Sequence, residues 1–258
     1  MRYLLVLFSY FRAILVLPLA LIQFLLICVL SLIFSIFSFP KIFIHTVFKY
    51  FWATPLLKIL NVNIIITGEE NLPKKSQSTL YLFNHSSLLD IPLVLLVVPH
   101  IYFGAKSSLF KIPIFGLAMK LYGALKIYRG RSSQTIDMYK KEASKRAQNG
   151  DSFALAPEGG RHYEHGKLAD FKKGPFLLSF FSQIPVVPIV ITGAHQVLNK
   201  SSIFCNWGRW KSNIKISILP SQPVTQYLEE DLGIFKNKVK TLMQEEYARC
   251  IHVDTKSI

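Results

Sequence analysis

A histidine and an aspartate stand five residues apart in the stretch YLFNHSSLLDIP, where His85 follows an apolar run that predicts a buried strand. The acid, Asp90, lies in a segment that predicts a helix. A carboxylate that bonds one ring nitrogen fixes the imidazole tautomer and leaves the other nitrogen free to take a proton from a hydroxyl. The spacing therefore suits a general base with its orienting acid. A histidine that caps a helix, beside an aspartate that pairs with a nearby lysine, is the alternative.

A second polar group follows another predicted strand, in the stretch ALAPEGGRH. Its glycines, Gly159 among them, let backbone amides approach a ligand, and Arg161 offers a planar set of donors for an anion. Glu158 stands between a proline and two glycines, which suits neither a helix nor a core, so we expect it to orient a substrate hydroxyl or Arg161. The polar residues HYEH that follow fit a flexible loop better than a metal site.

A third stretch, GALKIYR, predicts a short strand that ends in Arg129. An arginine at a strand end makes a good phosphate clamp, because the guanidinium group is a fork of donors. Taken alone, the stretch is better explained by a solvated surface arginine. A fourth stretch, VPIV at residues 187–190, is apolar and says nothing by itself.

From residue 61 onward, predicted strands alternate with predicted helices. NVNIIITG, STLYLFN, SFALAP, VVPIVITG and IKISILP read as strands. SSLLDIPLVLLVV reads as a helix capped by Ser86 or Ser87, and TIDMYKKEASKRAQNG as an amphipathic helix stopped by Asn149 and Gly150. This alternation predicts an α/β domain with a mixed, largely parallel sheet flanked by helices, over residues 61–258.

Residues 1–60 are expected to form a helical membrane anchor. No residue from Ala13 to Phe39 is charged, and a helix of this length can cross a hydrocarbon core of about 30 Å. The run is too long, and its end too bulky, for a cleaved signal peptide. A single tilted span and a hairpin that returns to the same leaflet both fit. The following segment, residues 42–60, suits the membrane interface through Tyr50 and Trp52, with a core helix as the alternative.

The net charge of +15 narrows the class of partner. No acid precedes Glu69, and a second acid-free interval from Ile91 to Ile136 holds Lys106 and other basic residues spaced among apolar ones. This spacing favours an anionic membrane surface or a phosphorylated substrate and disfavours nucleic acid. Three cysteines without close spacing predict free thiols in a reducing compartment.

Together these stretches resemble the glycerolipid acyltransferase family. Asn84-His85 with Asp90 is similar to that family's NHxxxxD motif, GALKIYR to its second motif, PEGGR to its PEGTR motif and VPIV to its fourth. AKSSLFKIPIFG and DFKKGPF resemble connecting segments of the bacterial 1-acylglycerol-3-phosphate acyltransferases. The chain departs from the family pattern in the lining of the expected acceptor pocket, at Tyr128, Ala156, Gly160 and His162.

The resemblance implies transfer of a fatty acyl group from acyl-CoA or acyl carrier protein to the sn-2 hydroxyl of lysophosphatidic acid, which gives phosphatidic acid. It implies that His85 is the general base and that Asp90 orients it. It further implies that two arginines, Arg129 and Arg161, bind the acceptor phosphate, that Lys106 adds positive field, and that Glu158 positions the acceptor. No metal or organic cofactor is expected.

The implied place is the inner (cytoplasmic) membrane, with the catalytic domain, residues 61–258, facing the cytoplasm. Three rival interpretations stay open. In the first, the acceptor is a different lysolipid, such as a lyso-aminolipid. In the second, the chain is a hydrolase with Ser86 or Ser87 as nucleophile, although it lacks a GxSxG elbow. Or it is a non-catalytic protein that binds membrane surfaces, which does not need so complete a set of His, Asp, Glu and Arg.

Overall fold

The structure is a computed structural model that describes residues 2–74, 77–98, 100–128 and 132–255. In these ranges one seven-stranded sheet runs in the order β1-β7-β6-β2-β5-β3-β4. Its strands are β1 (Val62–Thr67), β2 (Leu80–Phe83), β3 (Ile101–Lys106), β4 (Leu125–Ile127), β5 (Ser152–Leu155), β6 (Val186–Thr192) and β7 (Ser212–Ile218). All neighbouring pairs are parallel except β6 with β7. The predicted mixed, largely parallel sheet is therefore confirmed.

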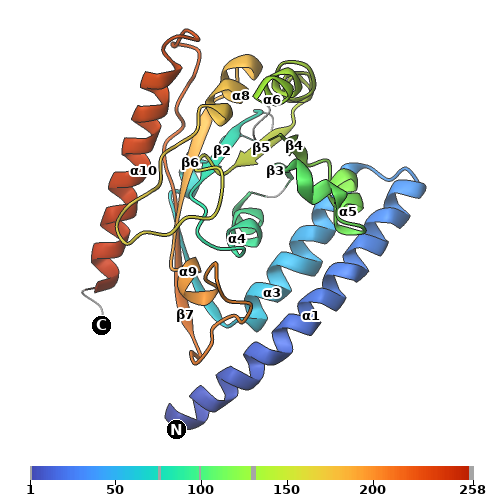
Figure 1. The fold of residues 1–258 in the computed structure, drawn as a ribbon, viewed down its shortest axis with the longest axis vertical. Coiled ribbons are helices and arrows are strands. Elements are labelled where there is room, and N and C mark those ends of the chain that lie inside the picture. Colours follow the sequence, from blue (N-terminus) through green and yellow to red (C-terminus); the bar gives the residue numbers. More distant parts are fainter. Residues whose placement is uncertain (1, 75–76, 99, 129–131, 256–258) are drawn as a thin grey trace.

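Helices flank the sheet on both faces (Figure 1). They are α1 (Arg2–Ile36), α2 (Lys41–Val47), α3 (Thr54–Ile59), α4 (Asp90–Val97), α5 (Phe115–Tyr122), α6 (Ser132–Met138), α7 (Ser144–Gln148), α8 (Gly174–Ser182), α9 (Ala194–Val197) and α10 (Leu232–Thr255). π-helical turns over Phe48–Ala53 and Tyr139–Ala143 join α2 to α3 and α6 to α7. The predicted amphipathic helix is thus present and ends at Gln148, beside Asn149 and Gly150.

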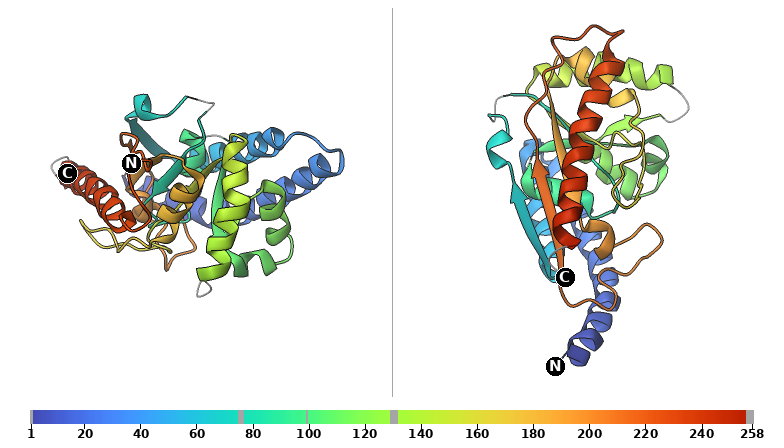
Figure 2. Two further views of the ribbon diagram at one scale, coloured as in Figure 1. Left: turned by 90° about the horizontal axis from the view of Figure 1, so that it is seen from above. Right: turned by 90° about the vertical axis from the view of Figure 1, so that its left-hand side faces the viewer.

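The two faces of the sheet are buried in two separate apolar clusters, as the period of two along a strand requires. In β2, Tyr81 and Phe83 face the cluster under α1, α2, α3, α4 and α9, whereas Leu80 and Leu82 face the cluster under α6, α7, α8 and α10. Figure 2 shows α10 and the N-terminal helices on opposite sides of the sheet. Each buried side chain of this size contributes roughly 1.5–3 kcal/mol, so a one-residue slip of β2 is strongly disfavoured.

The N-terminal residues form a pair of antiparallel helical arms. The 35-residue α1 continues through Pro18, and after a turn at residues 37–40 the second arm, α2 to α3, returns beside it. One face of the second arm, with Val47 and Leu57, belongs to the sheet's apolar cluster, while Tyr50 and Phe51 lie exposed on its other face. The segment 42–60 therefore includes a core-facing side, and the division at residue 60 stays a prediction.

The strand directions bring the chemically interesting loops to one edge. Because β2, β3, β4, β5 and β6 are parallel, their carboxyl ends meet there, followed by residues 84–89, 107, 128, 156–170 and 193. The amino end of β7 lies at the same edge, since β7 runs antiparallel to β6. The three cysteines, Cys28, Cys205 and Cys250, are buried free thiols, as expected.

Candidate active site

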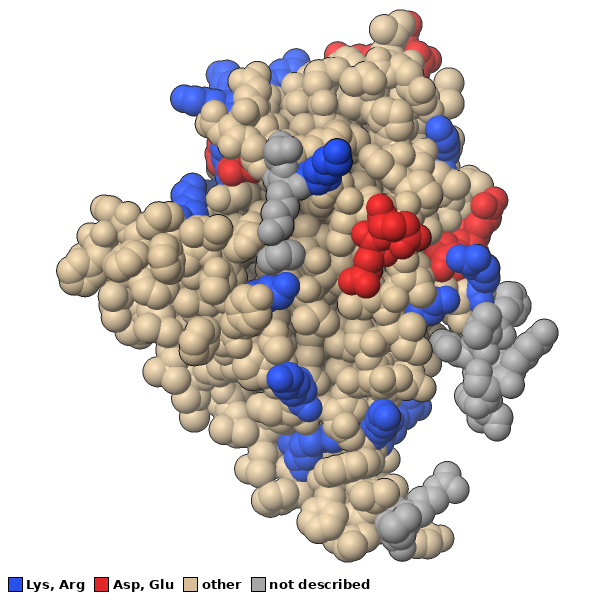
Figure 3. Space-filling model, turned by 180° about the vertical axis from the view of Figure 1, so that it is seen from behind, with Lys and Arg blue, Asp and Glu red and all other residues tan. Residues whose placement is uncertain are grey.

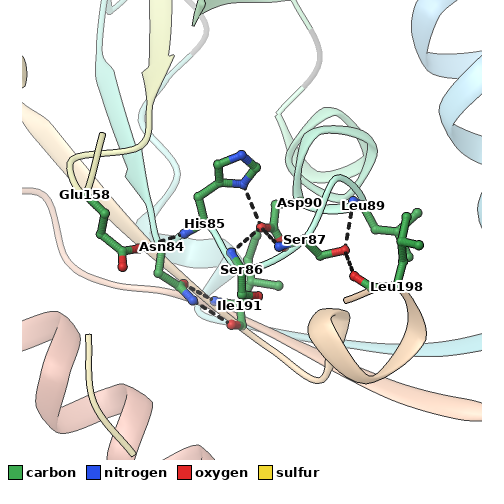
Figure 4. A network of polar contacts seen from close by, with 9 residues as sticks. All are labelled: Asn84, His85, Ser86, Ser87, Leu89, Asp90, Glu158, Ile191 and Leu198. Atoms are coloured by element: carbon green, nitrogen blue, oxygen red, sulfur yellow. Dashed lines mark hydrogen bonds and ion pairs between the residues drawn. The ribbon is translucent and has the colours of Figure 1, made fainter. Parts of the chain in front are cut away.

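The loop that follows β2 is pinned to its neighbour β6 by one side chain. Asn84, which is buried, donates from Nδ2 to the carbonyl of Ile191 (2.9 Å) and accepts from the amide of Ile191 at Oδ1 (2.7 Å) (Figure 4). These two bonds extend the β2–β6 pairing by one step beyond the strand. The next residue, His85, consequently leaves the sheet from a fixed position.

The carboxylate of Asp90 gathers three donors from the turn that follows. Its Oδ2 lies 2.9 Å from Nδ1 of His85 and accepts the amides of Ser86 and Ser87, both at 2.8 Å. Asp90 is fully buried, whereas the His85 side chain is 16% exposed. A carboxylate only accepts, so Nδ1 carries the ring proton and Nε2 of the neutral imidazole presents a lone pair. The pairing predicted from the five-residue spacing is present.

The predicted helix start is wrong in one respect. We expected Ser86 or Ser87 to cap a helix that begins there, but α4 begins at Asp90. The reason is the Asp90 carboxylate, which bonds both serine amides and holds residues 86–89 in a turn. The hydroxyl of Ser87 donates to the carbonyl of Leu198 (2.7 Å) and accepts the amide of Leu89 (3.2 Å). Among the described residues, neither serine hydroxyl is hydrogen-bonded to the imidazole.

Glu158 approaches the same histidine from the end of β5. Its Oε1 accepts the amide of His85 at 2.8 Å and its Oε2 accepts the amide of Ala169 at 3.2 Å. Only 4% of Glu158 is exposed, and this burial raises its pKa to about 7, against the lowering effect of the two amides. In the described chain no ion pair joins Glu158 to Arg161. An effect of Glu158 on a substrate hydroxyl therefore stays a prediction.

The PEGGR turn is held close to His85. The amide of His162 donates to the carbonyl of His85 (2.7 Å), and the amide of Gly159 closes a turn on Ala156 (3.1 Å). Gly159 has a φ of +77°, which a residue with a side chain rarely adopts, so the glycine is needed for this turn. Arg161 follows it and is half-buried. Lys106, expected to add positive field, is exposed at the end of β3, and Arg129, expected to bind the phosphate, lies outside the described residues.

A contact that the sequence did not suggest joins the two loops on either side of His85. The rings of Tyr163, from the loop after β5, and His195, from α9 after β6, stack with centroids 3.5 Å apart. Burial, together with the charge of Arg209, lowers the pKa of His195 to about 4. The ring is therefore neutral at physiological pH and stacks without a charge. Tyr163 stands in the HYEH stretch that was expected to be a flexible loop.

In the part of the chain that the structure describes, no group of three His, Cys, Asp or Glu side chains is placed to hold a metal ion. Glu164, one of the polar residues considered for such a group, lies 3.9 Å from Lys167 instead. That the reaction needs no cofactor stays a prediction.

Comparisons with known proteins agree with the motifs. A family profile described as Acyltransferase matches residues 63–192, from β1 to the end of β6. Among curated relatives, the 1-acyl-sn-glycerol-3-phosphate acyltransferase of Saccharomyces cerevisiae is 29% identical over 72% of this chain and 60% of its own length. The chloroplast enzyme of that name from Arabidopsis thaliana is 31% identical over 62% of this chain and 44% of its own length. A bacterial protein of that name, from Borreliella burgdorferi, is 29% identical over 57% and 58%.

The chain thus spans about half the length of the curated relatives it matches. The fold has a solved counterpart in the crystal structure of the 1-acyl-sn-glycerophosphate (LPA) acyltransferase PlsC from Thermotoga maritima, with a TM-score of 0.69. That match covers 97% of this chain and 98% of the other at 23% identity, and so shows a shared fold. Because the family profile covers half of the chain and includes His85, Asp90 and the PEGGR turn, this chain belongs to the acyltransferase family.

Proposed function

We propose that this chain is an O-acyltransferase that moves a fatty acyl group from acyl-CoA or acyl carrier protein to the sn-2 hydroxyl of lysophosphatidic acid, giving phosphatidic acid for phospholipid biosynthesis. The observation that carries the proposal is the 2.9 Å contact between Nδ1 of His85 and Oδ2 of Asp90, on a turn pinned to the sheet. It leaves Nε2 of a partly exposed ring as a base. The names of the relatives support the choice of acceptor.

The proposed reaction is a direct transfer. Nε2 of His85 takes the proton of the acceptor hydroxyl while the oxygen attacks the thioester carbonyl carbon. The new C–O bond forms, the C–S bond breaks, and the imidazolium returns the proton to the departing sulfur. Asp90 stabilises the imidazolium through its charge and keeps Nδ1 as the donor. No acyl-enzyme is formed, and no metal or organic cofactor takes part.

The cations at the carboxyl edge would bind the acceptor phosphate. Arg161 stands two residues beyond the Gly159 turn, which is tied through His162 to the main chain of His85. Arg129 is proposed to bind the phosphate together with Arg161, and Lys106 to add positive field. Each charge-assisted hydrogen bond to phosphate contributes roughly 1.5–3 kcal/mol, which suffices to orient the glycerol backbone toward the base.

We propose further that the N-terminal helices hold the chain at an anionic membrane. Among the described helices α1 is long and apolar enough to span a bilayer, but it packs against α2 and α5 along the domain. A helix that packs lengthwise against the domain is better suited to lie within one leaflet than to cross the bilayer. Seen from behind, the projecting end of the helix pair carries almost no charged side chain (Figure 3). The proposed place is the inner membrane, with residues 61–258 on the cytoplasmic side.

A different lysolipid acceptor is the second candidate. It is favoured by the small residues Ala156 and Gly160, which flank Pro157 to Gly159 at the end of β5 and are half-buried there. Small residues in this turn leave more room for a headgroup larger than phosphate alone.

The test is acyl transfer by the purified full chain in phospholipid vesicles. Labelled acyl-CoA and acyl carrier protein thioesters are supplied with a panel of lysolipids, and the product is identified by mass spectrometry. We expect labelled phosphatidic acid to form fastest. Faster acylation of an aminolipid or of a larger headgroup would select the second candidate, and the absence of any acylated lipid would reject both.

A further inference from the structure

The segment between α9 and β7, residues 199–211, is here called the aromatic loop. It exposes large apolar side chains, with Ile203 63%, Trp207 50% and Trp210 41% accessible. It also exposes three basic side chains, Lys200, Arg209 and Lys211. No acidic residue occurs in the chain between Phe171 and Leu228. Exposed aromatic and aliphatic groups among cations, without acids, are the composition that binds the interface of an anionic bilayer.

The aromatic loop is held in a fixed shape. Asn206 lies at its centre, is fully buried and has a φ of +52°. Its amide donates to the carbonyl of Val197 (2.6 Å), and its Nδ2 donates to the carbonyl of Leu60 (2.7 Å). Because this buried residue anchors the main chain, Ile203 and Trp207 on either side of it stand outside the core. The exposure of these two side chains therefore follows from the anchored conformation of the loop.

The first turns of α1 dock on this loop. Arg12 donates to the carbonyls of Trp210 (2.8 Å) and Arg209 (2.7 Å), and its guanidinium lies 4.8 Å from the centre of the Trp210 ring. The rings of Tyr10 and Trp207 are 4.8 Å apart. An arginine on an apolar helix is costly in hydrocarbon unless it is paired, and here the loop supplies its partners. Figures 1 and 2 show the two segments side by side.

A hollow of about 250 Å³ with an almost wholly apolar lining lies along this part of α1, bordered by Ile59 of α3 and by Trp210 of the aromatic loop. Its walls include Phe8, Phe11, Leu15, Ile59 and Trp210, and Arg12 is its charged member. An apolar hollow that opens to the surface beside a single cation matches the chemistry of a phospholipid, which has acyl chains below an anionic headgroup. The hollow, the exposed face of α1 and the aromatic loop are therefore continuous.

The aromatic loop is also connected to the candidate base. Arg209 donates to Oε1 of Gln196 in α9 (3.1 Å), and the carbonyl of Leu198 just after α9 accepts the hydroxyl of Ser87 (2.7 Å). The amide of Ser87 in turn donates to Asp90. A bilayer that binds the aromatic loop would consequently lie close to the carboxyl edge of the sheet.

We infer that the aromatic loop and the first turns of α1 form one docking surface for an anionic phospholipid bilayer, which places the edge carrying His85 at the lipid interface. The inference rests on the proposed action on a membrane lipid. It adds that the bilayer contacts the catalytic part of the chain itself, and not only the N-terminal helices.

The test reads the depth of one tryptophan and needs no acyl transfer, so it is independent of the proposed activity. The chain has three tryptophans, and the double variant Trp52→Phe/Trp210→Phe leaves Trp207 as the fluorophore. The full chain is placed in vesicles of phosphatidylglycerol and phosphatidylcholine that contain a lipid brominated near the headgroup end of its acyl chains. We expect bromolipid to quench Trp207 at least twofold and aqueous acrylamide to quench it little. The variant Trp207→Phe/Trp210→Phe reports Trp52 of the second helical arm, which packs partly buried on the core, so the contact of the N-terminal helices with lipid is measured separately.

A matched pair of variants locates the contact. Ile203→Asn in the aromatic loop and Ile234→Asn at the start of α10 each replace an isoleucine that is 63% exposed. We expect Ile203→Asn to halve the bromolipid quenching of Trp207 and Ile234→Asn to leave it unchanged. Equal effects, or Trp207 open to acrylamide in vesicles, would overturn the inference. It would also be overturned if a second copy of the chain, at raised protein concentration, or an acidic carrier protein shielded Trp207 without lipid.

Discussion

Oε1 of Glu158 accepts the main-chain amide of His85 at 2.8 Å, which ties the end of β5 to the end of β2. The other oxygen of the same carboxylate accepts the amide of Ala169. A single buried acid thus fixes both the turn that carries the base and the loop that follows the PEGGR motif. In this arrangement Glu158 holds together the two segments that carry His85 and Ala169.

Glu158 should make the stability of the chain depend on pH. Burial raises its pKa from 4.5 to about 7, so between these values the folded chain holds a proton that the unfolded chain has released. Its contribution is fully present below about pH 4.5 and is lost as pH rises through 7, a change on the order of 3 kcal/mol. We expect Glu158→Gln to reduce the fall in melting temperature between pH 5 and pH 8. Glu164→Gln, an exposed acid of the same loop, is the control and should change nothing.

The His85–Asp90 pair should be essential for transfer. His85→Ala and Asp90→Asn are each expected to lower kcat by roughly a thousandfold or more, because the first removes the base and the second removes the anion that orients it. Both should leave the chain folded by circular dichroism. His165→Ala, an exposed histidine of the nearby loop, serves as control. Wild-type turnover by His85→Ala would end the mechanism.

Arg161 should act on the acceptor and not on the donor. Arg161→Ala is expected to raise KM for a phosphorylated lysolipid by roughly 10- to 150-fold, the equivalent of losing about 1.5–3 kcal/mol of charge-assisted binding. KM for the acyl thioester should stay near its wild-type value. Lys167→Ala removes an exposed cation of the same loop and should affect neither constant. An equal rise for both substrates would mean that Arg161 lies in a different pocket.

The two serines after His85 separate a transferase from a hydrolase. Ser87→Ala leaves the carbonyl of Leu198 and the amide of Leu89 without a partner, so it should cost about 1–3 kcal/mol of stability while appreciable transfer persists. Ser86→Ala should have a smaller effect on stability. Mass spectrometry after rapid quench with the thioester should find no acyl ester on either residue. A stable acyl-serine whose loss parallels a large fall in rate would establish the hydrolase interpretation instead.

Removal of residues 1–60 should damage the fold as well as membrane binding. Val47 and Leu57 of the second arm pack in the same cluster as Leu93 and Ile189, so a chain that begins at Asn61 leaves that cluster open to water. Losing several such contacts at roughly 1.5–3 kcal/mol each exceeds the stability of an ordinary domain. We expect this variant to aggregate or to melt without a cooperative transition. A soluble, cooperatively folding product would instead support the division at residue 60.

Local patterns in the sequence were enough for the sheet class and most elements. Six of the described strands are predicted by short β-rich runs, with β4 inside the stretch GALKIYR, but β3 is missed because Gly104 weakens its strand pattern. The packing of β3 against β5 requires this glycine, since a Cβ at Gly104 would lie 1.9 Å from Cδ2 of Leu155 in β5. The long helix α10 was missed although its signal is present, as Phe235, Val239 and Met243 recur every four residues and face the second cluster.

By itself the sequence determined which chemistry is available: His85 at a strand end, Asp90 five residues on, and a Pro-Glu-Gly-Gly-Arg turn, because residue types and short spacings are local properties. Only the tertiary structure decided what each group touches. Glu158 reaches the amide of His85 because β5 pairs with β2, and Asn84 reaches Ile191 because β6 pairs with β2 on the other side. Bonds between residues so far apart in the chain depend on strand order, which is set when the two apolar clusters close around the sheet.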